Sequence, residues 1–367
     1  MRQNHRTCAL WHFPQSRPLY PSHGKYATPC AWALVSFGGP ILSSIILSIL
    51  GFVAPSIVIY LVIAFTAILV GKPVKQAQEG SDISFKALRL DYSQMPKLEA
   101  FATRDGKQLA YRRYPSQSEK ILILLHGSGW HSQYFYPLAD FLSSRNLCRV
   151  FTPDLRGHGQ CPERRGDIDY IGQFEDDIAD LILTIRRNNP GATMVVGGHS
   201  SGGGLAVRFA GSRYGSMADA YLLLAPYLKY NAPTVRRNSG GWARPNIGRI
   251  VGLSMLNNIG VRWLNSMRVI DFDMPIDYRN GSETLSYSFR LNTNFAPRDY
   301  RKSLKATTRP ILLVSGVEDE VMHSSAFEPE ISRYAAARVE LLRGVSHMGV
   351  VVGAEVRPVV EDWLRGL

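Results

Sequence analysis

The sequence predicts an α/β fold, with a mostly parallel central sheet covered by helices on both faces, behind an apolar N-terminal segment. Short, continuous apolar runs such as 121–125 (ILILL) alternate with amphipathic helical stretches such as 174–187. Runs of that kind are typical of strands buried on both faces of a parallel sheet. The segment 31–71 stands apart because it has no ionisable side chain other than a tyrosine hydroxyl.

The composition favours a globular domain with a leader over a disordered or nucleic-acid-binding chain. Of its 367 residues, 45% are hydrophobic and 20% are charged. The net charge is +12, yet residues 1–78 contain Lys and Arg without any Asp or Glu. The rest of the chain has only short basic runs, such as Arg186-Arg187, and lacks the basic stripe with aromatic residues of a nucleic-acid binder. We therefore expect no nucleic-acid partner, and a basic leader attracted to anionic lipid.

The leader predicts an integral membrane protein. Residues 1–30 form an irregular basic segment, and 31–71 is long enough for a transmembrane helix, which needs about 20 apolar residues. A proline at position 55 leaves open a helical hairpin that turns near 51–55. A buried core helix is the alternative. Lys72, Lys75, Lys86 and Arg89 follow the stretch, so the positive-inside rule favours a catalytic domain on the cytoplasmic side.

The four cysteines predict neither a zinc site nor a disulfide framework. Cys8 and Cys30 lie in the leader, Cys148 and Cys161 lie in the domain, and none forms a C-x-x-C pair. Cys148 borders an expected strand, where we expect it to act as a small buried hydrophobe. No metal site is therefore expected.

After a linker at 72–96, the apolar runs place an α/β domain at 97–367. A strand pair is expected around the Asp105-Gly106 turn. The interval 227–308 lacks a strand repeat, so we expect a cap inserted after the sixth strand. The expected strands cover 98–103, 108–114, 121–125, 149–153, 193–197, 220–224, 311–315 and 339–342, and the principal helices cover 132–143, 174–187, 205–213 and 354–364.

The segment Gly198-His199-Ser200-Ser201-Gly202 is the sharpest chemical signal. It fits the G-x-S-x-G pattern, follows an expected strand and precedes an expected helix. The turn is tight, so flanking glycines remove Cβ clashes and expose the serine at a helix N-terminus. Ser200 is therefore the expected nucleophile, the alternative being an incidental serine in a glycine-rich turn.

A serine nucleophile needs a base and an acid, which follow it in the chain on this kind of fold. His347 lies in a loop just after the last strand, where it could reach Ser200; His323 is its rival. In the loop after the preceding strand, Asp319 has the expected spacing, whereas its neighbours at 318 and 320 fit a solvated acidic turn. We therefore expect Ser200, Asp319 and His347 to form a catalytic triad.

The turn His126-Gly127-Ser128-Gly129-Trp130 follows a buried strand and can present backbone N–H groups to a substrate oxyanion. The expected donors are the N–H groups of Ser128 and Ser201. His126 is expected to hold the loop, and Trp130 is a candidate for the acyl pocket. The turn that starts at Asp154 (DLRGHG) suggests a fixed structure with an internal ion pair.

Together these motifs resemble the α/β-hydrolase superfamily, and in particular its monoacylglycerol lipase and lysophospholipase-like (serine aminopeptidase-like) branch. The matching segments are H-G-S-G at 126, D-L-R-G-H-G at 154, G-H-S-S-G-G at 198, G-V-E-D at 316 and S-H-M at 346. The resemblance covers about 98–367, while the hydrophobic leader and the cap sequence depart from it.

The resemblance implies an acyl-enzyme mechanism without metal or organic cofactor. We expect a membrane-anchored esterase acting on lipid-derived esters such as lysophospholipid or monoacylglycerol. A small-ester esterase, a thioesterase and a peptidase are the enzymatic alternatives. A catalytically silent membrane-anchored binding protein is the alternative of another class, and protein partners are not indicated by the sequence.

Overall fold

The computed structural model describes residues 39–73, 83–160, 162–236, 239 and 241–367. The expected irregular segment 1–30, the first part of the apolar stretch, and Cys8, Cys30 and Cys161 lie outside these residues. Cys148 is buried and unpaired by a disulfide, in the environment expected for a small hydrophobe.

The apolar stretch forms one helix, α1 (Gly39–Val70), which runs through Pro55 without the turn that a hairpin requires. Its part from Gly51 to Val70 has 20 residues and is long and apolar enough to cross a membrane, by length and composition. Large side chains such as Phe52 and Leu69 are exposed, which a helix in the core of a soluble domain does not allow. One such helix is consistent with a transmembrane segment.

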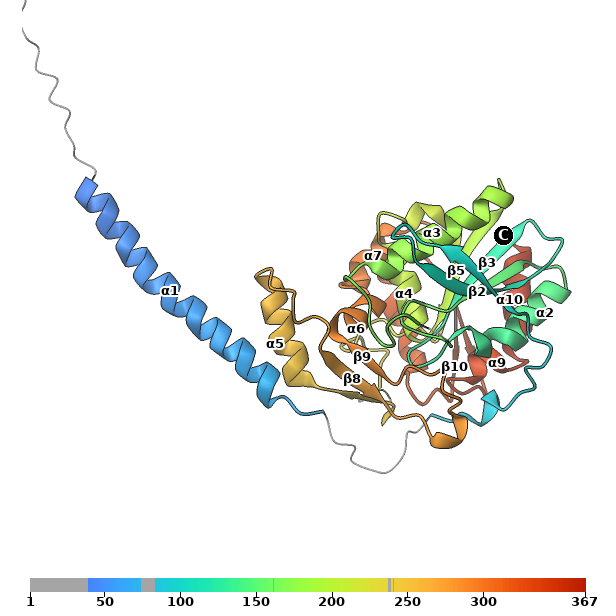
Figure 1. Ribbon diagram of the computed structural model, residues 1–367. Coiled ribbons are helices and arrows are strands. Elements are labelled where there is room, and N and C mark those ends of the chain that lie inside the picture. The colour runs from blue at the N-terminus through green and yellow to red at the C-terminus, as the bar shows by residue number, and fades with distance from the viewer. Residues whose placement is uncertain (1–38, 74–82, 161, 237–238, 240) are drawn as a thin grey trace, which may run out of the picture. The chain divides into compact units, whose positions relative to one another are not determined.

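The central sheet has eight strands in the order β1-β2-β4-β3-β5-β6-β10-β11 (Figure 1). β1 and β2 pair antiparallel with their neighbours, and all the other pairs are parallel. The prediction of a mostly parallel α/β-hydrolase sheet is therefore confirmed. The strands are β1 (Leu98–Ala102), β2 (Gln108–Tyr114), β3 (Lys120–Leu125), β4 (Arg149–Pro153), β5 (Thr193–His199), β6 (Ala220–Leu224), β10 (Ile311–Gly316) and β11 (Arg338–Leu342).

Helices cover both faces of this sheet (Figure 1). α3 and α4 pack together on one face, and α2, α9 and α10 pack together on the other. On α3 the apolar residues at 178, 181, 182 and 185 are buried, as their helical spacing predicts. The helices are α2 (Tyr136–Ser144), α3 (Gln173–Asn188), α4 (Ser201–Ala210), α9 (Gly349–Val352) and α10 (Val356–Arg365).

The chain between β6 and β10 forms a separate layer with its own small antiparallel sheet, β7-β8-β9. β7 and β9 have only three residues each, and none of the three strands is a continuous apolar run, which is why none was expected here. We call this insertion the cap. Its elements are β7 (Ala243–Pro245), α5 (Ile247–Asn258), β8 (Arg268–Phe272), β9 (Ser286–Ser288), α6 (Phe289–Phe295) and α7 (Tyr300–Ala306), with a short 3-10 helix at Ile276–Tyr278.

The described part of the expected linker, from residue 83 onward, is packed rather than loose. It contains a 3-10 helix, η1 (Lys86–Leu88), and buries Ile83, Phe85 and Leu88 in the main core. The Phe85 ring lies 5.4 Å from that of Trp242 and 5.6 Å from that of Tyr278, both in the cap. These apolar residues are separated by polar ones, so the composition alone looks like a linker.

Candidate functional site

Ser200 lies at the sharp turn between β5 and α4. Its backbone has φ +54° and ψ −122°, a conformation that L-residues rarely adopt and that stores strain. A Cβ on Gly198 would overlap the carbonyl oxygen of Gly202, and one on Gly202 would overlap that of Leu125. The glycines of the G-x-S-x-G segment are therefore needed for this turn, which leaves the Ser200 side chain half-buried at the start of α4.

Asp319 and His347 meet at the carboxyl ends of β10 and β11. His347 Nδ1 lies 2.8 Å from Asp319 Oδ2. The other carboxylate oxygen, Oδ1, accepts hydrogen bonds from the backbone N–H groups of Val321 (2.8 Å) and Met322 (2.7 Å). Because a carboxylate can only accept, Nδ1 carries the proton and Nε2 is left with a free lone pair. This is the tautomer that a general base requires.

The loop that carries His347 is fastened to the serine turn through His199. His199 Nε2 lies 3.0 Å from the carbonyl oxygen of His347, and the two rings are 4.6 Å apart. Among the residues that the structure describes, Ser200 Oγ makes no hydrogen bond to His347. Nucleophile–base contacts are often long in free enzymes and shorten when substrate binds.

The structure distinguishes between the residues that the sequence offered as the acid and the base of the triad. His323 is exposed at the start of a short 3-10 helix (Ser324–Ala326), and Asp319 pairs with His347 instead. Of the neighbouring carboxylates, Glu318 is exposed and Glu320 is half-buried, as a solvated turn would have them, but each also accepts a backbone hydrogen bond. Glu320 Oε2 accepts the backbone N–H of His347 at 2.8 Å, and Glu318 Oε2 accepts that of Val345 at 3.2 Å. Both hold the base loop by its backbone.

The two residues expected to supply oxyanion donors are in direct contact. The Ser128 N–H donates to Ser201 Oγ at 2.7 Å, and the two hydroxyl oxygens are also 2.7 Å apart. The hydroxyl of Ser201 therefore occupies the Ser128 N–H, one of the two expected oxyanion donors. Trp130 stands beside this loop, with its ring 6.1 Å from that of Phe85 and 6.0 Å from that of Tyr134.

His126 and Arg156 hold the neighbouring loops together. His126 Nε2 accepts the N–H of Leu155 at 3.0 Å, and burial lowers the pKa of this histidine to about 4, so the ring is neutral. Arg156 pairs with Asp177 at 2.7 Å and with Asp105 at 3.0 Å. The turn at 154–159 is thus held by fixed contacts, as expected, but the ion pairs of Arg156 are made with residues outside the turn rather than within it.

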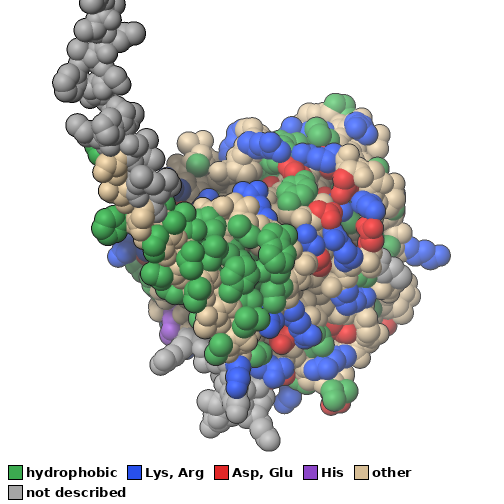
Figure 2. Space-filling view, turned by 60° about the vertical axis from the view of Figure 1, so that its left-hand side comes forward, with side chains coloured by type: hydrophobic (Ala, Val, Ile, Leu, Met, Phe, Trp, Pro, Cys, Tyr) green, Lys and Arg blue, Asp and Glu red, His purple; other side chains and the backbone are tan. Residues whose placement is uncertain are grey.

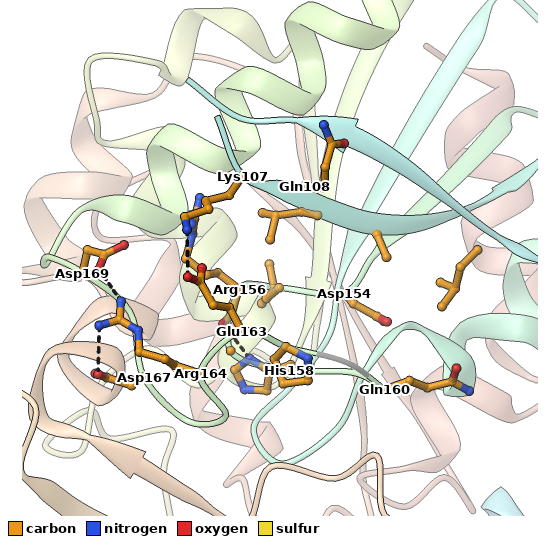
Figure 3. A pocket seen from close by; sticks show the side chains of 16 residues that line it. Lys107, Gln108, Asp154, Arg156, His158, Gln160, Glu163, Arg164, Asp167 and Asp169 are labelled. Atoms are coloured by element: carbon orange, nitrogen blue, oxygen red, sulfur yellow. Dashed lines mark hydrogen bonds and ion pairs between the residues drawn. The ribbon is translucent and has the colours of Figure 1, made fainter. Parts of the chain in front are cut away.

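A separate hollow lies beside β2 and the loop 154–169 (Figure 3). Its lining does not include the candidate triad, and its charges largely neutralise one another. Lys107 pairs with Glu163 at 2.7 Å, and Arg164 pairs with Asp167 and Asp169. The residues that the structure describes contain no group of three or more His, Cys, Asp or Glu arranged to hold a metal ion.

Comparisons with known proteins identify the family. The family profile described as serine aminopeptidase, S33 matches residues 116–348, which include the strained serine and the Asp–His pair. The chain belongs to this S33 family. Human monoglyceride lipase is 25% identical over 268 residues, which cover 71% of this chain and 85% of the relative. The monkeypox virus monoglyceride lipase homolog is 23% identical over 261 residues, covering 66% and 88%.

Solved structures agree with the fold. A soluble variant of monoglyceride lipase from Saccharomyces cerevisiae has a TM-score of 0.59 at 17% identity, covering 76% of this chain and 98% of that one. Monoacylglycerol lipase from Paleococcus ferrophilus has a TM-score of 0.55 at 17% identity, covering 71% and 99%. As an S33 member with such relatives, the chain is a serine hydrolase of the carboxylic-ester class.

Two buried tyrosines against the oxyanion loop, Tyr134 and Tyr287, were not singled out in the sequence. Tyr287 belongs to the cap strand β9, 158 residues from its partner Gly129. A contact across such a separation leaves no local pattern, so the sequence offered no signal for Tyr287, whereas Tyr134 lies only seven residues from its partner Gly127.

Proposed function

We propose that the protein is a membrane-anchored serine hydrolase that cleaves esters of membrane-derived lipids, monoacylglycerol or lysophospholipid, through an acyl-enzyme. The catalytic part of this proposal rests on the hydrogen bond between His347 Nδ1 and Asp319 Oδ2, which are 2.8 Å apart, next to the strained turn at Ser200. An imidazole held in this tautomer near a serine hydroxyl at a strained turn is the arrangement used for acyl transfer.

In the proposed mechanism, His347 Nε2 takes the proton of Ser200 as Oγ attacks the ester carbonyl. The Ser201 hydroxyl leaves the Ser128 amide, and the carbonyl oxygen takes its place against the N–H groups of Ser128 and Ser201. As the tetrahedral intermediate collapses, His347 returns the proton to the departing alcohol. Water, deprotonated by His347, then attacks the acyl-enzyme and releases the fatty acid.

The lipid substrate is supported by the relatives and by the surface of the cap. Human monoglyceride lipase and the yeast enzyme are lipases by name. On the cap, Ile247, Val251, Ile259 and Trp263 are exposed, Trp263 by 72%. Figure 2 shows apolar side chains gathered on the face that α5 and residues 57–70 of α1 present. An apolar surface of this kind, with a tryptophan, suits the boundary of a lipid bilayer.

Membrane anchoring is supported by close packing between α5 and the end of α1. A Cβ on Gly248 would lie 2.8 Å from the carbonyl oxygen of Ala67, and one on Gly252 would overlap that of Ala64. The Tyr60 hydroxyl donates to the carbonyl of Met255 at 2.8 Å. Small residues spaced by four, such as Gly248 and Gly252, allow this close approach between the two helices and fix the cap to the end of the apolar helix. The basic residues at 72, 75, 86 and 89 favour a cytoplasmic catalytic domain.

The test is hydrolysis by full-length protein in detergent micelles and in vesicles. The substrates are p-nitrophenyl esters of increasing chain length, monoacylglycerol and lysophosphatidylcholine, and Ser200→Ala is the matched control. Activity that rises with chain length and disappears in Ser200→Ala is expected.

Activity confined to short esters or to thioesters would keep the serine chemistry and overturn the lipid assignment. No turnover of any ester, together with no labelling by a fluorophosphonate, would overturn the enzymatic proposal in favour of a binding protein.

A further inference from the structure

The backbone amides on either side of Ser128 are each held by a buried tyrosine. The N–H of Gly127 donates to the Tyr134 hydroxyl at 2.7 Å, and the N–H of Gly129 donates to the Tyr287 hydroxyl at 2.7 Å. Both tyrosine side chains are almost fully buried. Ser128, the expected oxyanion donor, therefore stands between two fixed amides.

Each tyrosine in turn contacts a buried histidine. Tyr134 Oη lies 3.2 Å from His199 Nδ1, and Tyr287 Oη lies 2.7 Å from His158 Nε2. Burial lowers the pKa of both histidines well below the ordinary value, so both rings are neutral.

The second nitrogen of each ring fixes the direction of these hydrogen bonds. His199 Nε2 lies 3.0 Å from the carbonyl oxygen of His347, and His158 Nδ1 lies 3.0 Å from that of Arg156. A carbonyl only accepts, so these nitrogens carry the ring protons and the other nitrogens accept from tyrosine. Each relay then runs from amide N–H to tyrosine, from tyrosine O–H to histidine, and from histidine N–H to carbonyl.

We propose that these two tyrosine–histidine pairs are positioning residues that aim the Ser128 amide at the reacting carbonyl oxygen. The inference rests on the oxyanion role given to Ser128 in the proposed function. The Tyr134–His199 pair ties the oxyanion loop to the backbone of the base, His347. The Tyr287–His158 pair ties the same loop to the cap, so a correctly seated cap completes the oxyanion hole.

Gly129 of the oxyanion loop makes a second hydrogen bond to the cap. The N–H of Thr284 donates to the carbonyl of Gly129 at 3.1 Å, so both backbone polar groups of this glycine bind the cap. Gly129 itself has φ +80°, in the left-handed region, and a Cβ there would press on the Trp242 ring. A Gly-Ser-Gly loop is intrinsically adaptable, and these external contacts limit its freedom.

Preorganised donors matter because stabilisation of the oxyanion falls steeply when a donor is lost or misplaced. Removal of one oxyanion donor costs about 10²–10³-fold in kcat. Loss of a residue that only aims the donor should cost less, and we expect about tenfold in kcat with KM changed by less than about twofold.

The experiment uses Tyr287→Phe and Tyr134→Phe in the full-length protein. Each change removes one oxygen and keeps the ring. Tyr221→Phe is the matched control, because Tyr221 is equally buried on β6 and its hydroxyl donates to the carbonyl of Gly215 at 2.9 Å, away from the oxyanion loop. Titration with a fluorophosphonate counts the active sites in each preparation.

The readout is the ratio of kcat for an oxygen ester to kcat for its thiono analogue, in which sulfur replaces the carbonyl oxygen. A well-aimed oxyanion hole favours oxygen, so displacement of the Ser128 amide lowers this ratio. A variant that merely folds less well loses both activities equally. We expect the ratio to fall by about tenfold in Tyr287→Phe and Tyr134→Phe and to stay unchanged in Tyr221→Phe.

Unchanged kcat and an unchanged ratio in both variants would overturn the inference while leaving the proposed function intact. Absence of ester turnover in the unaltered protein would overturn the proposed function, and this inference with it.

Discussion

Replacement of Asp319 by Asn tests the acid of the candidate triad while conserving shape. The two carboxylate oxygens have different surroundings, and this fixes how an amide must sit. Oδ1 accepts two backbone N–H groups, from Val321 and Met322, so the amide oxygen has to take that place. The NH₂ group is then directed at His347 Nδ1, where the carboxylate oxygen stood at 2.8 Å.

This swap inverts the tautomer of His347. An NH₂ group donates to Nδ1, so the ring proton moves to Nε2, and Nε2, the proposed acceptor of the Ser200 proton, can no longer accept it. We expect kcat to fall by about 10⁴-fold, the loss that the same Asp→Asn change causes in a serine protease triad. Because hydrogen-bond partners remain on both sides, the free energy of unfolding should change by only about 1 kcal/mol.

The assay is p-nitrophenyl butyrate hydrolysis at saturating substrate, with the unfolding midpoint measured on the same preparations. Glu320→Gln is the matched control from the same loop, because its carboxylate holds the His347 backbone and does not touch the ring. That variant should keep kcat within about fivefold. If Asp319→Asn retained kcat within tenfold, or if Glu320→Gln lost as much, the tautomer argument would be refuted.

Three further outcomes follow from the structure. Ser201→Ala removes the hydroxyl that competes with the substrate oxygen for the Ser128 N–H, so kcat/KM for ester hydrolysis should rise about fivefold, equivalent to about 1 kcal/mol. A decrease of kcat/KM by more than tenfold would show that this hydroxyl assists catalysis instead. Phe85→Ala deletes a buried ring between the cap and Trp130 and should lower the free energy of unfolding by about 3–5 kcal/mol in a denaturant titration, whereas the exposed Lys86→Ala should leave it unchanged. The pKa of His126 is about 4 in the folded protein against an ordinary 6.5, so the contribution of this neutral ring to the free energy of unfolding is complete above pH 6.5. As the pH falls toward 4, the free energy of unfolding should decrease by about 3 kcal/mol from this group. A free energy of unfolding that stays constant between pH 7 and pH 5 would contradict this.

The sequence was sufficient to bring the candidate site residues together, because they lie at the ends of regular elements. The G-x-S-x-G turn needed only a buried strand before it and a helix after it, and the structure places Ser200 between β5 and α4. Asp319 and His347 were found by the same logic, because the carboxyl ends of β10 and β11 meet at one edge of the sheet. Periodicity and turn chemistry are local properties, so they can be read from neighbouring residues.

The contacts that were missed join residues far apart in the chain. Phe85 looked like part of a linker, yet it packs against Trp242 and Tyr278 of the cap. Glu320 looked like a solvated acid, yet it holds the backbone of His347. Tyr287 gave no signal, because its partner Gly129 lies 158 residues earlier in the sequence. Packing and hydrogen-bond satisfaction decided these positions, and neither property has a local sequence pattern.

The proposal that Ser200 is the nucleophile is tested by identifying the residue that a fluorophosphonate modifies. The full-length protein is labelled in detergent, digested, and the modified peptide is sequenced by mass spectrometry, with Ser200→Ala and Asp319→Asn treated in parallel. We expect one modified site at Ser200, no label in Ser200→Ala, and labelling slowed by about 10³-fold in Asp319→Asn, since the phosphonate needs the same base as an ester. Labelling of another serine, or ester hydrolysis that survives in Ser200→Ala, would contradict the proposal.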